Sequence, residues 1–228
     1  MEHQENIPKK QRSAIISLLA FSAVAFAMCF VAIFAITLWH RNYLLTQRIH
    51  QTPPGYFINN TYVNEQLGWQ ISFPENFNTY TSEQIRNWQH LSLMPGFEQA
   101  GRRQLQLFLV AGEYFSTLAL AQKDILTSRE ALLDPLLLIE RRHEQLKSSI
   151  REQSKHSVRF EPFNEVVNGI SFRGLAIEYS NGPEPTKWQR VYTTVLDDYM
   201  LHYALVFQDM DHGNALGEAF FNSRFQNQ

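Results

Sequence analysis

Apolar and polar residues are distributed along this chain in two different patterns. Residues 14–39 form one uninterrupted apolar run, AIISLLAFSAVAFAMCFVAIFAITLW, without a charge, proline or glycine. As a helix this run would be about 39 Å long at ~1.5 Å per residue, more than the ~30 Å hydrocarbon core of a bilayer. The pattern therefore predicts a single transmembrane helix over residues 14–39, preceded by a tail of residues 1–13.

Two other interpretations of the apolar run are weaker. Ala25-Phe26-Ala27 resembles a signal-peptidase site, but cleavage would leave the apolar residues 28–39 at the new N-terminus, and signal peptides have shorter apolar regions. Cys29 does not follow the small residues of a lipoprotein signal. We therefore expect an uncleaved membrane anchor.

Charges around the span set its expected orientation. Lys9, Lys10 and Arg12 precede it, whereas Arg41 and Arg48 follow it. Since basic residues favour the cytosolic side, we expect a single-pass protein of the cell membrane with a cytosolic N-terminus. The C-terminal domain would then be extracytoplasmic, and periplasmic in a Gram-negative cell.

Beyond the span the pattern changes to short alternating segments. Thr52-Pro53-Pro54-Gly55 ends any helix that continues from the span, because proline cannot continue a helix. We assign residues 40–61 to a linker and residues 62–228 to one folded domain. Alternation predicts strands at 62–67, 69–73, 104–109, 115–121, 170–179, 188–196 and 199–207. Spacing by three and four predicts helices within 129–155 and at 214–224, and the capping-box pattern of Thr81 and Gln84 predicts a short helix at 81–88.

Turn and cap residues sharpen these assignments. Asp134-Pro135 fits an N-cap followed by proline at the first helical position, and Asn168-Gly169 favours a type I′ hairpin. The apolar phase of the strand that follows slips at Gly174, which predicts a β-bulge there. Hairpins outnumber strand–helix–strand units, so the domain is predicted to be α+β with a largely antiparallel sheet.

The amino-acid composition excludes several classes of protein and of site. Apolar residues make up 44% and charged residues 18% of the chain, which excludes wholesale disorder. The net charge of −2 argues against a nucleic-acid partner held by bulk charge. A single cysteine excludes an intrachain disulfide and a cysteine-cluster metal site.

The chain carries no readable catalytic or cofactor motif, so we name no catalytic, cofactor-binding or metal-ligating residue. Glu140 and His143 have the Glu-x-x-His spacing of di-iron sites, but such sites need two copies, and a hydrogen-bonded buried histidine is the commoner case. The acidic stretch from Asp209 to Asn214 is explained by a turn and a helix cap. Whether the protein is an enzyme stays open, with a non-enzymatic role the working hypothesis.

One loop is a candidate for partner recognition. Gly182-Pro183-Glu184-Pro185 is rigid and precedes an aromatic residue, Trp188. Loops held by a rigid scaffold often carry binding residues, and tryptophan is enriched in interfaces. The candidate partner-binding residues are Pro183, Glu184, Pro185 and Trp188.

The domain also resembles a known family. The segment GWQISFPENF at 68–77, the Asn168-Gly169 hairpin and the ending AFFNSRF at 219–225 are similar to the PsbP/Mog1-like superfamily, which includes bacterial DcrB-like domains. The resemblance covers about residues 60–226. It implies an α/β/α sandwich around an antiparallel sheet and a role in binding or assembly, with no shared catalytic residues.

Together these observations predict a membrane-anchored, non-enzymatic binding or scaffold protein. It would present its domain to a membrane or envelope protein, with the lipid bilayer as its other partner, and bind no nucleic acid. Two alternatives remain open: an accessory subunit of a larger membrane complex, and a ligand-binding or hydrolytic domain whose site the sequence does not reveal.

Overall fold

The chain forms two compact units, Met1–Gln47 and Arg48–Gln228. The computed structural model describes residues 28, 30–37, 39–40, 53–86, 104–127, 129–182 and 185–226. In the first unit the described residues are helical, and their large apolar side chains, such as Phe30, Phe34 and Trp39, are exposed.

The predicted membrane span is only partly covered by these residues. Among the residues described, no helix has the length and apolar character needed to cross a membrane. Residues 14–27 of the predicted span lie outside the described part of the chain. The transmembrane helix over 14–39 therefore stays a prediction.

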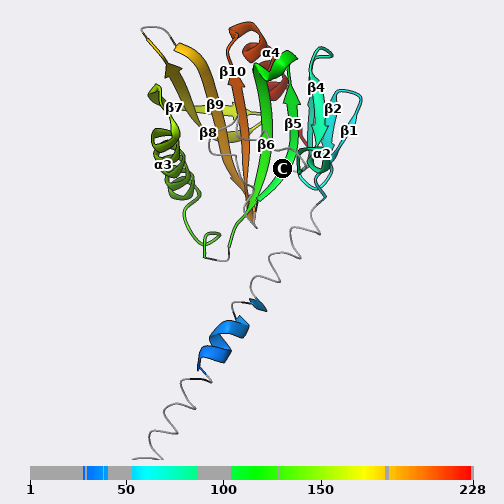
Figure 1. Ribbon diagram of the computed structural model, residues 1–228. Helices are drawn as coiled ribbons and strands as arrows, with labels where there is room; N and C mark the ends of the chain where they lie inside the picture. The colour runs from blue at the N-terminus through cyan, green and yellow to red at the C-terminus, as the bar shows by residue number, and fades with distance from the viewer. Residues whose placement is uncertain are drawn as a thin grey trace, which may run out of the picture. The chain divides into compact units, whose positions relative to one another are not determined.

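The second unit contains the strands and most helices (Figure 1). Its strands are β1 (Tyr56–Ile58), β2 (Thr61–Asn64), β3 (Trp69–Ser72), β4 (Asn78–Thr81), β5 (Gln104–Ala111), β6 (Thr117–Ile125), β7 (Ser157–Val167), β8 (Ile170–Ser180), β9 (Pro185–Leu196), β10 (Tyr199–Phe207) and β11 (Arg224–Phe225). Its helices are α2 (Ser82–Arg86), α3 (Pro135–Gln153), α4 (Met210–Phe221) and the short 3-10 helix η2 (Glu113–Phe115). β1 lies inside the residues that we assigned to the linker.

The strands build two sheets rather than one. The large sheet has seven strands in the order β4-β5-β6-β10-β9-β8-β7, and the small sheet has four in the order β1-β2-β3-β11. The paired strands in both sheets are antiparallel. The prediction of an α+β domain with antiparallel pairing is confirmed.

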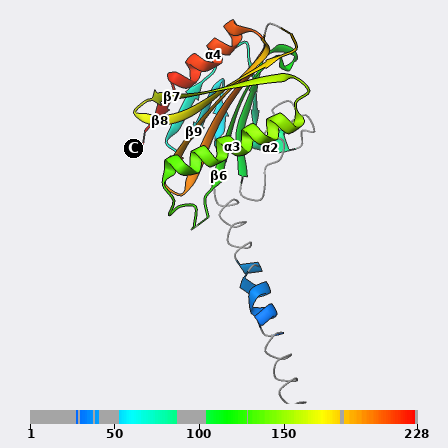
Figure 2. The same cartoon turned by 90° about the vertical axis from the view of Figure 1, so that its left-hand side faces the viewer.

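Helices α3 and α4 cover opposite faces of the large sheet (Figure 2). Phe220 of α4 packs with Tyr203 of β10, whereas Ile150 of α3 packs with Ala204 of the same strand. Successive strand residues point to opposite faces, so the two helices lie on either side. The small sheet joins α4 on its side, because Trp69 of β3 belongs to the same apolar cluster as Phe220.

Local signals in the sequence act as predicted. The Asp134 carboxylate accepts hydrogen bonds from the backbone N–H groups of Leu136 and Leu137, with Pro135 at the start of α3. Asn168 and Gly169 both have positive φ, 47° and 83°, as a type I′ turn requires. Helix α4 begins at Met210, earlier than the predicted residue 214.

Two details of strand phase differ from the sequence prediction. The bulge predicted at Gly174 is absent: β7 and β8 pair in continuous register there. A Cβ on Gly174 would lie 2.2 Å from the Phe163 ring, so glycine makes room for that ring. Register shifts occur instead in β5, between Gln106 and Phe108, and in the pairing of β8 with β9, between Tyr179 and Ser180.

Candidate functional site

The loop residues singled out from the sequence are only partly described by the structure. Pro183 and Glu184 lie outside the described residues, and Pro185 begins β9. Trp188 is half-buried and stacks on Phe207, with ring centroids 5.9 Å apart. A recognition role for this loop stays a prediction.

A row of polar residues crosses the sheet face that α3 covers. Gln106 of β5 lies opposite Gln122 of β6, which lies opposite His202 of β10, which lies opposite Thr193 of β9. Directly paired residues share a face of the sheet, so these four side chains line up beneath α3. We call Gln106, Gln122, His202 and Thr193 the polar row.

The bulge in β5 puts the first member of this row on the α3 face. Strict alternation from Leu109 would place Gln106 on the opposite face, where α4 and the small sheet pack. The extra residue, Leu107, resets the phase, as bulges do. Leu107 and Phe108 consequently both join the cluster on the α4 side, whereas Leu109 joins the cluster on the α3 side.

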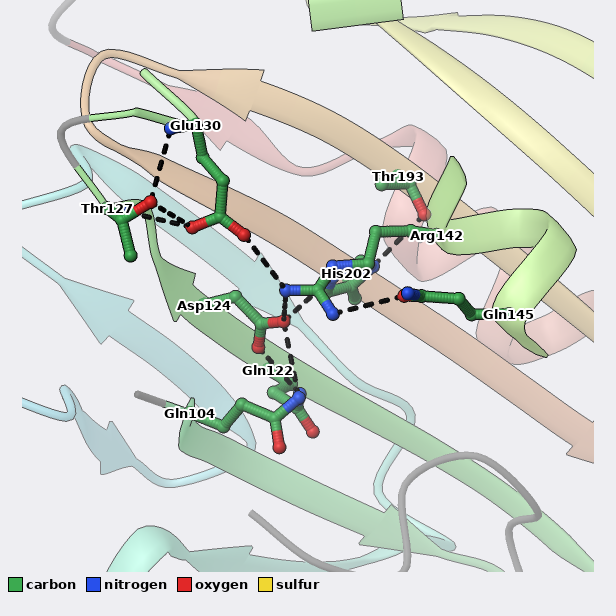
Figure 3. A network of polar contacts seen from close by, with 9 residues as sticks. All are labelled: Gln104, Gln122, Asp124, Thr127, Glu130, Arg142, Gln145, Thr193 and His202. Carbon is green, nitrogen blue, oxygen red and sulfur yellow. Dashed lines mark hydrogen bonds and ion pairs between the residues drawn. The ribbon is translucent and has the colours of Figure 1, made fainter. Parts of the chain in front are cut away.

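Asp124 is the centre of the hydrogen-bond network beside the row (Figure 3). Its carboxylate is buried and accepts hydrogen bonds from the side-chain amides of Gln122, at 2.7 Å, and Gln104, at 3.2 Å. Nε2 of His202 lies 3.6 Å from Oδ2 of Asp124. Burial raises the pKa of Asp124, but His202 and the two amides outweigh it, so the pKa lies below its ordinary value.

Two histidines share the hydroxyl group of Thr193. Nδ1 of His202 lies 3.1 Å from Oγ1 of Thr193, and Nε2 of His143, from α3, lies 3.2 Å from the same oxygen. Burial lowers the pKa of His143 to about 4, with a smaller contribution from the nearby His202, so His143 is neutral at pH 7. The sequence prediction of a hydrogen-bonded histidine on the buried face of α3 is confirmed.

Arg142 closes the network from the other side of Asp124 (Figure 3). Its Nη2 lies 3.8 Å from Oδ2 of Asp124 and 3.9 Å from Oε1 of Glu130. Glu130 is held by Thr127, whose backbone N–H and hydroxyl both donate to Oε2 at 2.8 Å and 2.7 Å. This is the reciprocal arrangement of a capping box, and it fixes the second carboxylate beside the guanidinium.

A pocket of about 220 Å³ opens between α3 and these strands. Helix α3 supplies Arg142, His143, Leu146 and Ser149 to its lining, and the strands supply Gln122, Asp124, Val191, Thr193 and His202. The pocket is smaller than the ~300–1,000 Å³ typical of sites for drug-sized molecules. It is nevertheless far larger than the ~10–15 Å³ that one water molecule needs.

The described residues do not provide a set of ligands for a metal ion. No group of three or more histidine, cysteine, aspartate or glutamate side chains lies close enough there to hold a metal ion. Asp209 caps α4 by accepting from the backbone N–H groups of Asp211 and His212. The helix-cap interpretation of the acidic stretch is confirmed.

The sequence contains a signal for this site in the positions of its polar residues along the strands. Gln122 and Asp124 occupy the same phase of β6 as the buried Leu118 and Leu120, and His202 occupies the phase of Ala204. Polar residues at positions where the pattern requires apolar ones mark a buried polar site. Which of them meet depends on the pairing of β5, β6, β10 and β9, which no single strand specifies.

Comparison with known proteins shows no family for this chain. No protein-family model and no curated protein matches the chain. The structure is similar to the solution structure of cyanobacterial PsbP (CyanoP) from Synechocystis sp. PCC 6803, at 10% sequence identity and a TM-score of 0.49, over 75% of this chain and 96% of that chain. Nothing about the ligand, the partner or the membrane attachment of this chain follows from a similarity at this level.

Proposed function

We propose that the protein is a membrane-anchored binding protein whose α+β domain holds a small polar ligand in the pocket beneath α3. The observation that carries this proposal is a pocket floored by buried polar side chains. Burying a polar group without a compensating partner costs ~1–3 kcal/mol in proteins. A domain that needed only stability would place apolar residues at Gln122, His202 and Thr193.

The geometry favours binding over catalysis. Asp124, His202 and Thr193 follow the order carboxylate, imidazole, hydroxyl that acyl-transfer enzymes use. The hydroxyl of Thr193, however, lies between two imidazole nitrogens and the side chain is 0% exposed. A nucleophile must reach the reacting atom, and this hydroxyl is enclosed.

The predicted anchor gives such a protein its place of action. A domain tethered by the span at 14–39, with its N-terminus in the cytosol, would work in the space next to the outer surface of the membrane. Tethering raises the effective concentration of a domain near membrane components. A ligand that reaches or leaves the membrane could therefore be held there.

A pair of neighbouring serines on α3 tests the pocket. Ser149 lines it, whereas Ser148 is exposed. We would screen small polar metabolites for saturable changes in Tm of the full chain in detergent, then repeat the hits with Ser149→Trp and Ser148→Trp. The proposal predicts that Ser149→Trp abolishes the shift and Ser148→Trp keeps it. Equal loss in both variants, or no saturable hit, would contradict it.

A second candidate function, the scaffold role, has an observation of its own. Leu132, three residues before α3, is 87% exposed; Leu137, in the first turn of α3, is 62% exposed, and Leu136 is also exposed. Exposed apolar side chains that cluster favour association with a partner. We propose that this leucine patch contacts another envelope protein if the domain is a scaffold.

The scaffold role is tested by cross-linking in intact membranes. Leu132→Gln with Leu137→Gln should remove a cross-linked partner, while Val166→Gln, an equally exposed apolar residue on β7, should not. A partner that survives the leucine substitutions would exclude the patch as its contact.

A further inference from the structure

Thr193 limits how protons can be arranged around the two buried histidines. Its hydroxyl oxygen lies 3.1 Å from Nδ1 of His202 and 3.2 Å from Nε2 of His143, and all three side chains are buried. A hydroxyl group carries one proton and also accepts. Thr193 can therefore donate to only one of these nitrogens and must accept an N–H from the other, so the two rings cannot choose their protons independently.

Asp124 sets the direction of the two hydrogen bonds when both rings are neutral. Its Oδ2 lies 3.6 Å from Nε2 of His202 (Figure 3). This distance is too long for a strong hydrogen bond, but the carboxylate charge still favours a proton on that nitrogen. Nδ1 of neutral His202 then accepts from the Thr193 hydroxyl, and the Thr193 oxygen accepts from Nε2–H of His143.

A proton added to the pair is stabilised on His202 rather than on His143. On the His202 side, the carboxylates of Asp124 and Glu130 lie 3.8 Å and 3.9 Å from one guanidinium, that of Arg142. Two negative groups against one positive group leave a negative balance there. A nearby negative charge favours the charged form of an imidazole.

His143 has weaker support for a positive charge. The carboxylate beside it on α3, that of Glu144, is exposed and accepts a hydrogen bond from Lys147 at 2.6 Å. Burial lowers the pKa of His143 to about 4, and the nearby His202 and Lys147 act in the same direction. His143 therefore stays neutral when His202 takes up a proton.

We infer that these three side chains form a switch operated by one proton, in which protonation of His202 reverses both hydrogen bonds of Thr193. A charged His202 carries a proton on Nδ1 as well, so it donates to the Thr193 oxygen. The hydroxyl then donates to Nε2 of His143, and the ring proton of His143 moves to Nδ1. The network gains one proton in total, because Thr193 and neutral His143 each keep one.

The two states of the switch differ in the lining of the pocket, to which both imidazole rings belong. His143 is the Nε2–H tautomer in one state and the Nδ1–H tautomer in the other. A ligand that binds the two states unequally shifts the balance between them, so its affinity would depend on pH. This consequence rests on the proposed binding function, whereas the switch itself is tested without a ligand.

NMR of the ring nitrogens in the natural chain tests the direction of the hydrogen bonds. The full chain in detergent micelles is labelled with 15N in its histidines. The signals are recorded from about pH 8 to about pH 5, on either side of the ordinary histidine pKa of ~6.5. Ring nitrogens with and without a proton have well-separated 15N shifts, and spectra of His143→Gln and His202→Gln assign the two rings.

We expect His143 to change from the Nε2–H to the Nδ1–H tautomer with the same midpoint at which His202 gains its second ring proton. A His143 ring that keeps one tautomer while His202 is titrated would overturn the switch. The same holds if His202 stays neutral over the whole range, or if His143 becomes charged first.

Two variants of the shared residue test the coupling. Thr193→Val removes the hydroxyl, so the tautomer of His143 should no longer follow the titration of His202. Thr193→Ser keeps the hydroxyl and should keep the coupled change. Coupling that persists in Thr193→Val would overturn the role of the hydroxyl, and if that variant does not fold, the spectra of the natural chain decide alone. A failed switch would leave the binding function standing, and a failed metabolite screen would leave the switch standing.

Discussion

Several side chains on the α3 face of the large sheet are both buried and hydrogen-bonded, whereas an ordinary core would have apolar side chains there. His143, Thr193, His202 and Asp124 are each less than a tenth exposed, and each has a polar neighbour within 3.6 Å. Such groups are favourable only as a connected set, because removing one leaves its partners unsatisfied. The predictions for single residues therefore concern the cost of breaking a contact.

The first prediction at this scale concerns acid stability and His143. The folded pKa of about 4 lies below the unfolded value of ~6.5. Between these values the unfolded chain binds a proton that the folded chain does not, so the free energy of unfolding should fall by up to about 3 kcal/mol as pH drops from 6.5 to 4. Below pH 4 this loss should stop.

Urea titrations of the full chain in detergent, at several pH values, measure this effect. His143→Gln should lose most of the pH dependence in that window, whereas His156→Gln, at an exposed histidine, should keep it. Identical profiles for the natural chain and His143→Gln would contradict the prediction. The contribution of Asp124, whose pKa is lowered, is lost only at pH values below its ordinary pKa of ~3.9.

A second prediction concerns the hydroxyl group between the two histidines. Thr193→Val keeps the shape of the side chain but leaves Nδ1 of His202 and Nε2 of His143 without their shared partner. The free energy of unfolding should fall by ~1–3 kcal/mol. Thr194→Val, at the next residue on the opposite face of β9, is the control and should cost less.

At the scale of elements, glycine and bulge positions decide which face a strand buries. β8 buries Phe172 against α4 early in its length and Leu175 against α3 later, and the register is continuous between these two residues. The change of phase in the sequence at Gly174 reflects a change of the covered face. The sequence alone does not distinguish a glycine that makes room for an aromatic ring from a glycine that permits a β-bulge.

Two glycines give opposite predictions on substitution by alanine. Gly174→Ala would force a methyl group into the Phe163 ring, 2.2 Å away, and should destabilise the domain by ~1–3 kcal/mol. Gly217, inside α4, has its nearest neighbours at 3.8 Å, so Gly217→Ala should stabilise by up to about 1 kcal/mol.

A double substitution checks the cause of the first effect. Phe163→Leu removes the ring that meets the new methyl group, so Gly174→Ala should cost clearly less in that background. Equal costs in both backgrounds, measured by urea titration, would show that the ring is not the reason for the glycine.

At the scale of the whole molecule, the chain joins two regions of different charge and polarity. Residues 1–52 carry five Lys/Arg against two acids, a net charge of +3, whereas residues 53–228 carry fifteen against twenty, a net charge of −5. The first region holds the apolar run, and the second holds the sheets and the pocket. The proposed function depends on both.

Fractionation tests the anchor directly. The full chain should sediment with membranes and resist extraction at alkaline pH, because a helix of ~20 or more apolar residues inserts stably. Deletion of residues 14–39 should release the domain into the aqueous fraction. A product that starts after Ala27 and needs no detergent would contradict the anchor. Protease digestion of the domain only from the cytosolic side would contradict the predicted orientation.

The local features of this protein follow from short stretches of its sequence. The cap at Asp134, the turn at Asn168-Gly169 and most strands were readable, because each depends on a few neighbouring residues and on a backbone preference that those residues fix. The same holds for the apolar run, whose length and lack of charge are properties of one segment.

The pocket and the division into two sheets depend on contacts between segments that are far apart in the sequence. Gln122, His202, Thr193 and His143 are brought together by the pairing of β6, β10 and β9 and by the docking of α3, and contacts between distant segments have no local signature. The bulge at Leu107 completes the polar row by turning Gln106 to the α3 face. The periodicity of the sequence shows which polar residues stand at positions that are otherwise apolar. The packing of the whole domain determines which hydrogen-bond partner makes the burial of each one favourable.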